Sequence, residues 1–159
     1  MREYKFRAWV KPVIEDGEVI YSGCMVDVLG IDFKRKKIIY YEPFDLLPMI
    51  GRKEELRFDE VELLQYTGLH DETDDEVEIY EGDIVKFSYK NKTYIGEVKF
   101  EAGTFILACN QLPDGYITML DITNFDRDYH WIEGIVIGNV YDNLEFRTVN
   151  NAEIKIAEQ

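Results

Sequence analysis

The sequence predicts a mainly β protein, a small barrel or sandwich of short strands. Aromatic residues make up 14% of the 159 residues, with 11 Tyr and 9 Phe, and these residue types favour strands over helices. Apolar and polar residues alternate in segments of about six residues, and turn residues recur about every eight to twelve. A chain of this length buries roughly two-thirds of its extended surface on folding, which is enough for one core without staples.

The first 60 residues predict a series of β-hairpins. Asp16-Gly17 stands between two short apolar runs and is a strong hairpin-turn signal. Gly30 is a second turn candidate. Pro48 excludes a long helix from the irregular stretch 43–51, which we expect to link two parts of the chain and to hold at most one helical turn, at 45–47. Strands are expected at 4–14, 19–21, 25–29 and 38–41.

The chain from residue 61 onward predicts a meander of short strands. The first strand ends at Thr67-Gly68, and the second alternates acidic with apolar residues, as strands with one wet face do. Turns are expected at 90–92, 101–103 and Pro113-Asp114-Gly115. Thr123 or Asn124 is predicted to cap a short helical turn that reaches Tyr129. The strands are expected at 61–66, 76–80, 84–89, 94–100, 104–109, 116–122 and 132–141.

Charge is unevenly distributed along the chain. The net charge is −14, but residues 1–60 carry 11 Lys/Arg and 12 Asp/Glu, a net of −1, which leaves −13 for the remainder. Proteins that bind duplex DNA gain affinity by replacing counterions with Lys and Arg, so the later part of the chain would repel phosphate. Lys34 to Lys37 form the one local basic patch, and a solvated loop is the favoured interpretation of it.

The remaining composition predicts a soluble cytoplasmic protein. Cys24 and Cys109 match no zinc spacing and are expected to be buried, reduced thiols rather than a disulfide. The charged N-terminus has no apolar segment of the kind found in secretory signals. No apolar run is long enough to span a bilayer.

Four stretches together indicate a family. They are Tyr4-Lys5-Phe6-Arg7-Ala8-Trp9, Leu64-Gln65-Tyr66-Thr67-Gly68-Leu69, the block from Ile79 to Val85, and Val136-Ile137-Gly138-Asn139-Val140-Tyr141. In this order the chain resembles the YopX family, small proteins of phages and prophages with no established biochemical activity. The resemblance implies an SH3-like β-barrel over residues 61–147, preceded by a β-rich, hairpin-rich region over 1–60 and followed by a polar tail, 148–159.

Five residues carry most of the resemblance and are the candidates for an interaction site: Tyr66, Gly68, Tyr80, Gly82 and Asp83. The structural interpretation, which we favour, is that the glycines supply backbone geometry, the tyrosines fill the edge of the barrel, and Asp83 bonds N–H groups of its own loop. The functional interpretation is a recognition surface, because aromatic side chains supply large contact area at modest entropic cost.

Acidic residues crowd the loop that begins at Asp71. Oxygen ligands suit calcium or magnesium, but an EF-hand loop needs Gly at its sixth position, which is Glu76 when counted from Asp71. An exposed, mutually repelling turn is therefore favoured. Related proteins commonly have a Lys- and Asn-Gly-type turn here, whereas residues 73–76 supply no Gly.

The string Asp126, Asp128 and His130 is the weakest candidate for a metal or acid–base site. Two carboxylates and an imidazole are suitable ligands, but no second His stands nearby, so a surface turn is favoured. His70 beside Asp71 is expected to be an exposed residue rather than a tuned base. No nucleotide motif occurs and no nucleophile is paired with a base. We therefore predict no metal, no cofactor and no enzymatic activity.

Three functions follow, in decreasing order of support. The first is a phage or prophage protein that docks onto another protein or onto copies of itself, in keeping with its aromatic content and with the strand edges expected of a small open barrel. The second is an acidic decoy that mimics DNA and occupies a DNA-processing protein. The third is a nucleic-acid binder that uses Lys34 to Lys37.

Overall fold

The computed structural model describes residues 3–44, 47–125 and 129–146, and the chain folds into two compact units. The N-terminal unit is Glu3–Gln65, and the C-terminal unit begins at Tyr66. The division lies inside one strand, β7 (Val61–His70), whose first five residues pair with the N-terminal unit. The sequence predicts the boundary between the two parts at Glu60. The start of a strand can be recognised from the local sequence, but the division of one strand between two units cannot.

The N-terminal unit is one antiparallel sheet. Its strands lie in the order β7, β1 (Phe6–Val10), β4 (Cys24–Asp32), β5 (Lys37–Phe44) and β6 (Leu47–Arg57), and a 3-10 helix, η1 (Phe58–Glu60), leads from β6 into β7. Its core is formed by four buried residues, Ala8, Val10, Ile38 and Val61, with partly buried apolar residues packed against them. These residues come from three strands, β1, β5 and β7, so burial joins segments that are far apart in the sequence.

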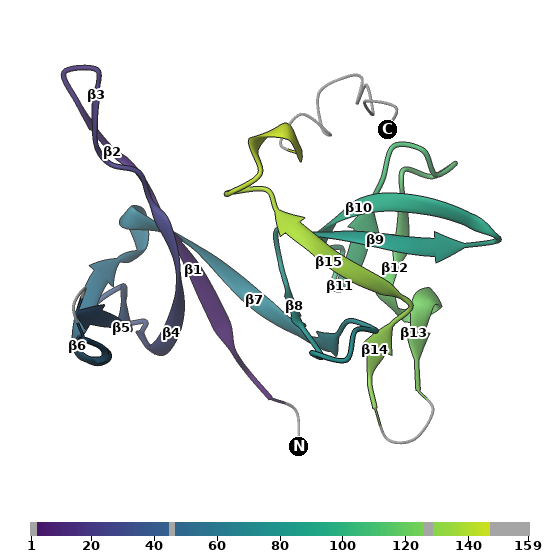
Figure 1. Ribbon diagram of the computed structural model, residues 1–159, viewed down its shortest axis with the longest axis horizontal. Helices are drawn as coiled ribbons and strands as arrows, with labels where there is room; N and C mark the ends of the chain where they lie inside the picture. Colours follow the sequence, from purple (N-terminus) through teal and green to yellow (C-terminus); the bar gives the residue numbers. More distant parts are fainter. Residues whose placement is uncertain (1–2, 45–46, 126–128, 147–159) are drawn as a thin grey trace. The chain divides into compact units, whose positions relative to one another are not determined.

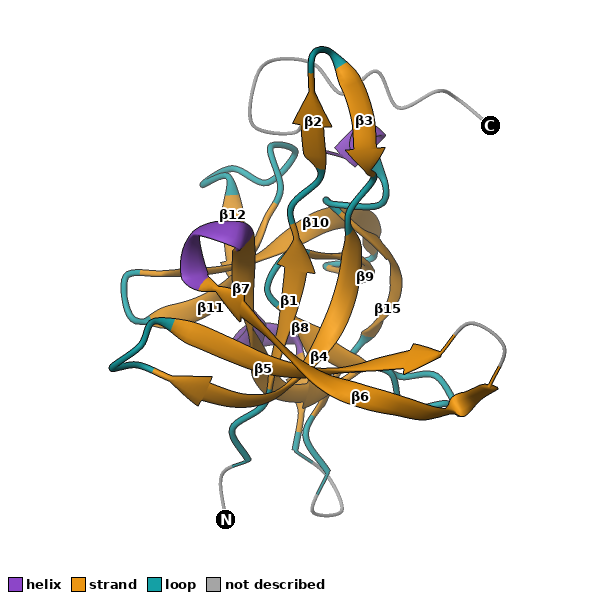
Figure 2. Ribbon diagram, turned by 90° about the vertical axis from the view of Figure 1, so that its left-hand side faces the viewer, coloured by secondary structure: helices purple, strands orange, loops and turns teal. Residues whose placement is uncertain are grey.

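Between β1 and β4 the chain forms a separate hairpin, β2 (Val13–Glu15) and β3 (Glu18–Tyr21). The two strands extend past the ends of β1 and β4 as a two-stranded ribbon (Figures 1 and 2). Asp16 and Gly17 at its tip have φ of 49° and 82°. Positive φ at both loop positions is the property of the type I′ turn that an Asp-Gly pair favours, which confirms the predicted hairpin.

Two expectations for this unit are wrong. Gly30 is not a turn but lies inside β4, at an irregularity where the register with β5 shifts between Val28 and Gly30. The stretch 43–51 is not a linker, since it contains the ends of β5 and β6, and Pro43 pairs with Gly51. Pairing between β5 and β6 extends over most of both strands, and Pro48 lies inside β6. The helical turn expected at 45–47 lies largely outside the described residues.

The C-terminal unit contains a five-stranded antiparallel sheet. Its order is β12 (Tyr116–Thr118), β11 (Thr104–Ala108), β10 (Lys92–Glu101), β9 (Asp83–Tyr89) and β15 (Gly134–Asn139). β8 (Glu78–Tyr80) and β14 (Trp131–Ile132) pair with the second half of β7, and β13 (Thr123–Asn124) pairs with β14. Apolar residues of β8 to β12, including Ile79, Val85, Phe87, Val98 and Leu107, form the core.

The mainly β prediction is confirmed, but the strands described here form no closed barrel. The five-stranded sheet ends at β12 on one side and β15 on the other, and these two strands do not pair with each other. The meander from β9 to β11 matches the predicted strand order, including the turn at Lys90-Asn91, where both residues have positive φ. The SH3-like geometry itself stays a prediction.

The segment after β12 differs from the sequence-based expectation. The strand ends at Thr118 and is followed by a 3-10 helix, η2 (Met119–Ile122), instead of continuing to residue 122. The Thr123 hydroxyl donates to the carbonyl of Met119 at 2.5 Å, and the backbone of Thr123 and Asn124 forms β13 opposite Ile132 and Trp131. The helical turn expected up to Tyr129 lies largely outside the described residues. Pairing with a segment further along the chain selects the strand here, and local propensity does not reveal it.

Candidate functional site

Four of the five predicted interaction residues are buried, and Gly68 is exposed. Tyr66, Tyr80 and Asp83 are buried, with 9%, 5% and 2% of their surface exposed. The two tyrosine rings pack against each other with centroids 5.3 Å apart, and the Tyr80 hydroxyl donates to the Glu78 carboxylate at 2.8 Å. The side chains thus offer little exposed contact area, in keeping with the structural interpretation.

The turn from Tyr80 to Asp83 explains why the motif needs these residue types. The Asp83 carboxylate accepts a hydrogen bond from the Tyr80 N–H at 2.8 Å and closes the turn between β8 and β9. Gly82 has φ of 81°, donates to the Val98 carbonyl and accepts from the Val140 N–H. The Gly82 backbone therefore connects the turn between β8 and β9 to β10 and to the segment that follows β15. The motif thus encodes a structural connection within the unit.

Gly68 interrupts β7 without ending it. Its φ is 83°, and the register with β8 shifts between Tyr66 and His70, so the strand passes through a bulge. The Thr67 hydroxyl donates to the Ile79 carbonyl at 2.9 Å and accepts from the Leu69 N–H at 3.1 Å. The prediction that the strand ends at Thr67-Gly68 is therefore wrong. The two hydrogen bonds of the Thr67 hydroxyl fix the backbone on either side of the glycine, and the strand continues to His70.

The acidic loop is organised around one buried carboxylate. Asp71 has only 2% of its surface exposed. One of its oxygens accepts from the Thr73 N–H, the Thr73 hydroxyl and the Val77 N–H, and the other accepts from the Val136 N–H. Asp74, Asp75 and Glu76 point into solvent. Among the residues that the structure describes, no group of three or more His, Cys, Asp or Glu side chains is placed to hold a metal ion.

Only part of the candidate site formed by Asp126, Asp128 and His130 lies within the described residues. Asp126 and Asp128 lie outside the described residues. His130 is exposed, and its ring contacts Phe125 edge-on, with centroids 5.3 Å apart. The His70 ring stacks with Trp131 at 6.4 Å and is partly buried. His70 is therefore less exposed than predicted, because β14 pairs with β7 at this residue.

The basic patch is locally compensated. Lys34 to Lys36 occupy the turn between β4 and β5, as the favoured interpretation of this patch requires, and Lys37 is the first residue of β5. Arg35 forms ion pairs with Asp32 at 2.7 Å and with Glu55 at 2.9 Å, and Lys37 lies 3.1 Å from the same Glu55. Hydrogen bonds from these cations lower the pKa of Asp32 and of Glu55 below their ordinary values. Two of the four cations thus already have acidic partners on this chain.

The two cysteines are free thiols. Cys109 is buried, as predicted, whereas Cys24 is only partly buried and its sulfur lies 2.7 Å from the Tyr21 hydroxyl. Burial of the Tyr21 phenol, together with this contact, raises its pKa. Among the described residues no helix is long and apolar enough to cross a membrane.

The sequence-based candidates omit the hairpin of β2 and β3, which we call the apolar hairpin. All seven of its strand residues are exposed. Ile14 and Val19 stand directly opposite each other with 61% and 62% of their surface exposed, and Ile20 is 60% exposed. The signal was available in the sequence: Val13-Ile14 and Val19-Ile20-Tyr21 place apolar residues on both faces of a two-stranded ribbon, and one core cannot cover both.

Comparison with known proteins identifies the family of this chain. Residues 5–146 match the family described as YopX protein. Neither a curated protein nor a solved structure matches the chain significantly. The match covers most of the chain and includes the four stretches quoted from the sequence except for Tyr4, and the chain accordingly belongs to the YopX family.

Proposed function

We propose that this chain is a non-enzymatic protein-interaction module, encoded by a phage or prophage, and that the apolar hairpin is its docking element. The observation that carries the proposal is the exposure of Ile14, Val19 and Ile20 on a ribbon that, among the described residues, pairs with no further strand. An isolated two-stranded hairpin is marginally stable in water, and contiguous exposed apolar surface marks interaction sites. Docking onto a partner covers the apolar surface and stabilises the ribbon.

The charges at the hairpin's tip specify the partner's chemistry. Glu15 and Glu18 are paired directly opposite each other, and Asp16 lies between them in the turn. Like charges directly opposite each other destabilise a strand pair, and the segment 13–21 contains no Lys or Arg to offset them. A partner with an apolar recess and a rim of Lys or Arg relieves this repulsion and covers the apolar residues at the same time.

A second copy of the chain fits this description less well. The chain has a net charge of −14, so two copies repel each other at low ionic strength. This favours a different protein as the partner over self-assembly. The enzymatic alternative has less support, since the sequence contains no recognisable catalytic motif.

The test compares an Ile14→Ser, Val19→Ser double variant with the unchanged chain. Each tagged protein is incubated with lysate of a bacterial host, captured species are identified by mass spectrometry, and the complex is rebuilt from purified components. We expect a stoichiometric complex whose affinity falls at least about tenfold in the double variant and weakens as salt is raised.

A matched control is Leu120→Ser, which removes another exposed apolar side chain, 66% exposed, from η2 in the C-terminal unit. It should leave the complex intact. Capture that is equal for the chain and the double variant, or the absence of any complex, counts against the proposal. Light scattering of the chain alone separates the two kinds of partner, because a dimer that depends on the hairpin replaces the foreign partner with a second copy.

A further inference from the structure

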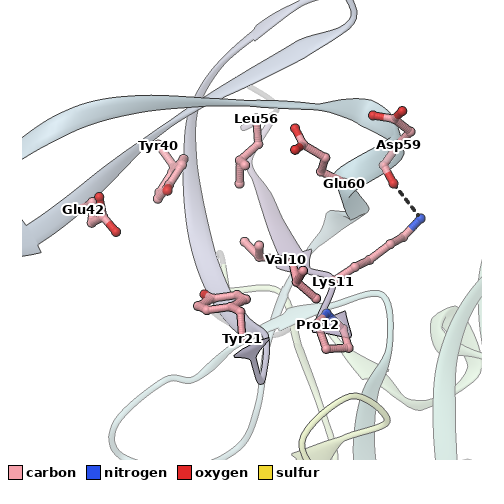
Figure 3. A pocket seen from close by; sticks show the side chains of 10 residues that line it. Val10, Lys11, Pro12, Tyr21, Tyr40, Glu42, Leu56, Asp59 and Glu60 are labelled. Atoms are coloured by element: carbon pink, nitrogen blue, oxygen red, sulfur yellow. Dashed lines mark hydrogen bonds between the residues drawn. The ribbon is translucent and has the colours of Figure 1, made fainter. Parts of the chain in front are cut away.

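A cavity of about 460 Å³ lies beside the base of the apolar hairpin in the N-terminal unit. Val10 of β1 and Leu56 of β6 line its interior, and Tyr21 and Tyr40 lie along one side (Figure 3). A second cavity, of about 680 Å³, shares Tyr21, Tyr40 and Glu42 with the first. We call the two adjoining cavities the tyrosine groove. Each has the size of a site for a small ligand or a side chain.

Carboxylates surround the tyrosine groove. Glu42 lies at one end of the first cavity, and Asp59 and Glu60 lie at the other end (Figure 3). Asp27 lines the second cavity. Lys11 is the one cation among the lining residues of both cavities, and it is held by the Asp59 carbonyl at 3.2 Å and the Glu62 carboxylate at 3.3 Å. The lining therefore carries four acidic groups against one basic group.

The negative charge of a lining carboxylate affects the ionisation of a tyrosine in the groove. Burial raises the pKa of Tyr40, and the negative charges of Glu42 and Glu54 raise it further. Arg52 lies 3.5 Å from Glu42, but both side chains are about half exposed, at 64% and 48%, and exposed ion pairs contribute little. Glu42 is therefore available to exchange Arg52 for a cation from another molecule.

We propose that the tyrosine groove binds an arginine side chain from an extended segment of the partner protein. This inference rests on the proposed function and names the group that the partner inserts. The aliphatic stem of arginine suits Val10 and Leu56, and its planar guanidinium stacks on phenol rings such as those of Tyr21 and Tyr40. Its several donors reach Glu42, and its weak hydration makes it easier to bury than a lysine ammonium.

The test is an NMR titration of the ¹⁵N- and ¹³C-labelled full chain with acetyl-Leu-Arg-Leu-amide. We expect saturable shift changes at Val10, Tyr21, Tyr40 and Leu56. The matched control is the same peptide with citrulline, which has nearly the shape of arginine but no charge, and we expect it to bind at least about tenfold more weakly. Absence of saturation, changes centred elsewhere, or equal binding of the citrulline peptide overturns the proposal.

Variants of the chain sharpen the result. Glu42→Gln should weaken binding of the arginine peptide about fivefold or more without affecting the citrulline peptide. Glu101→Gln, an exposed carboxylate of β10 in the C-terminal unit, should have no effect. Tyr40→Phe keeps the ring face and should retain the binding, whereas Tyr40→Leu should lose most of it. If Glu42→Gln binds both peptides as the unchanged chain does, the groove does not select a cation and the inference fails.

The result of the peptide titration can be distinguished from the result of the test of hairpin docking. Ile14 and Val19 do not line either cavity, so the hairpin double variant should still bind the arginine peptide. If the partner requires the hairpin while the peptide does not bind, the inference about the groove alone is wrong. If the peptide binds the groove while no partner requires the hairpin, the docking proposal alone is wrong.

Discussion

In the C-terminal unit, the carboxylate of Asp71 accepts a hydrogen bond from the backbone N–H of Val136 at 3.1 Å, although 65 residues separate the two in the chain. The other oxygen of the same carboxylate closes the acidic loop through Thr73 and Val77. A single buried side chain thus joins the start of the loop to β15. This arrangement makes Asp71 a structural residue in a segment whose composition suggests a cation site.

Replacing Asp71 tests that role. We expect Asp71→Ala to lower the free energy of unfolding by about 3 kcal/mol, because three backbone N–H groups and the Thr73 hydroxyl lose their acceptor. Asp71→Asn should lose less, since one amide oxygen still accepts. Denaturant unfolding measures both. Asp74→Ala, in the exposed part of the loop, is the control and should change stability by less than about 0.5 kcal/mol. Equal effects at the two positions contradict the assignment.

The turn at the tip of the acidic loop holds a strained residue. Glu76 has φ of 48°, and its N–H donates to the Thr73 carbonyl at 3.0 Å, so a tight turn forms without a glycine. Glu76→Gly should therefore raise stability by about 0.5–1 kcal/mol, because glycine adopts positive φ without strain. Asp75→Gly, at a position without positive φ, should lower it. A loss of stability in both variants would rule out strain at Glu76.

Gly82 and Gly103 offer a matched pair for steric tests. Both have φ of 81°, but a Cβ at Gly82 lies 2.8 Å from a ring carbon of Tyr141, whereas nothing lies within 4 Å at Gly103. Alanine at Gly103 should cost about 1 kcal/mol from backbone strain alone, and alanine at Gly82 should cost about 2–4 kcal/mol from strain plus the clash. Thermal and denaturant unfolding of the two variants give the difference. Indistinguishable losses would show that Tyr141 moves aside freely.

Glu97 on β10 predicts a pH dependence of stability. Burial raises the pKa of its carboxyl above the ordinary value, and nearby Lys99, at 3.7 Å, offsets this only in part. Between the ordinary pKa of about 4.3 and the raised value, the folded protein binds more protons than the unfolded chain, so this group's contribution to stability falls as pH rises.

The measurement compares the chain with Glu97→Gln from pH 4 to pH 8. The variant should gain stability relative to the unchanged chain as pH rises through this window, because it has no charge to desolvate. The difference between the two isolates Glu97 from Asp32 and Glu55, whose pKa values are lowered and whose contribution has the opposite sign. A difference that is independent of pH would show that Glu97 is not desolvated.

The sequence by itself determined the local features of this protein. The turns at Asp16-Gly17 and Lys90-Asn91 were predictable because preferences for positive φ belong to a few neighbouring residues. The strand-rich composition determined the β class, and the short stretches around Tyr66 and Gly82 determined the family. All of these depend on interactions within a few positions along the chain.

Only the tertiary structure decided the features that depend on pairing between distant segments. β7 continues through Gly68 because β8 and β14 pair with its second half, and Thr123 enters a strand because β14 lies beside it. Asp71 is hydrogen-bonded to the distant Val136, and Ile14 and Val19 are exposed on a hairpin that pairs with no further strand of the described chain. Hydrogen bonds and apolar contacts between remote residues fix these outcomes, and a local pattern does not encode which remote segment will supply them.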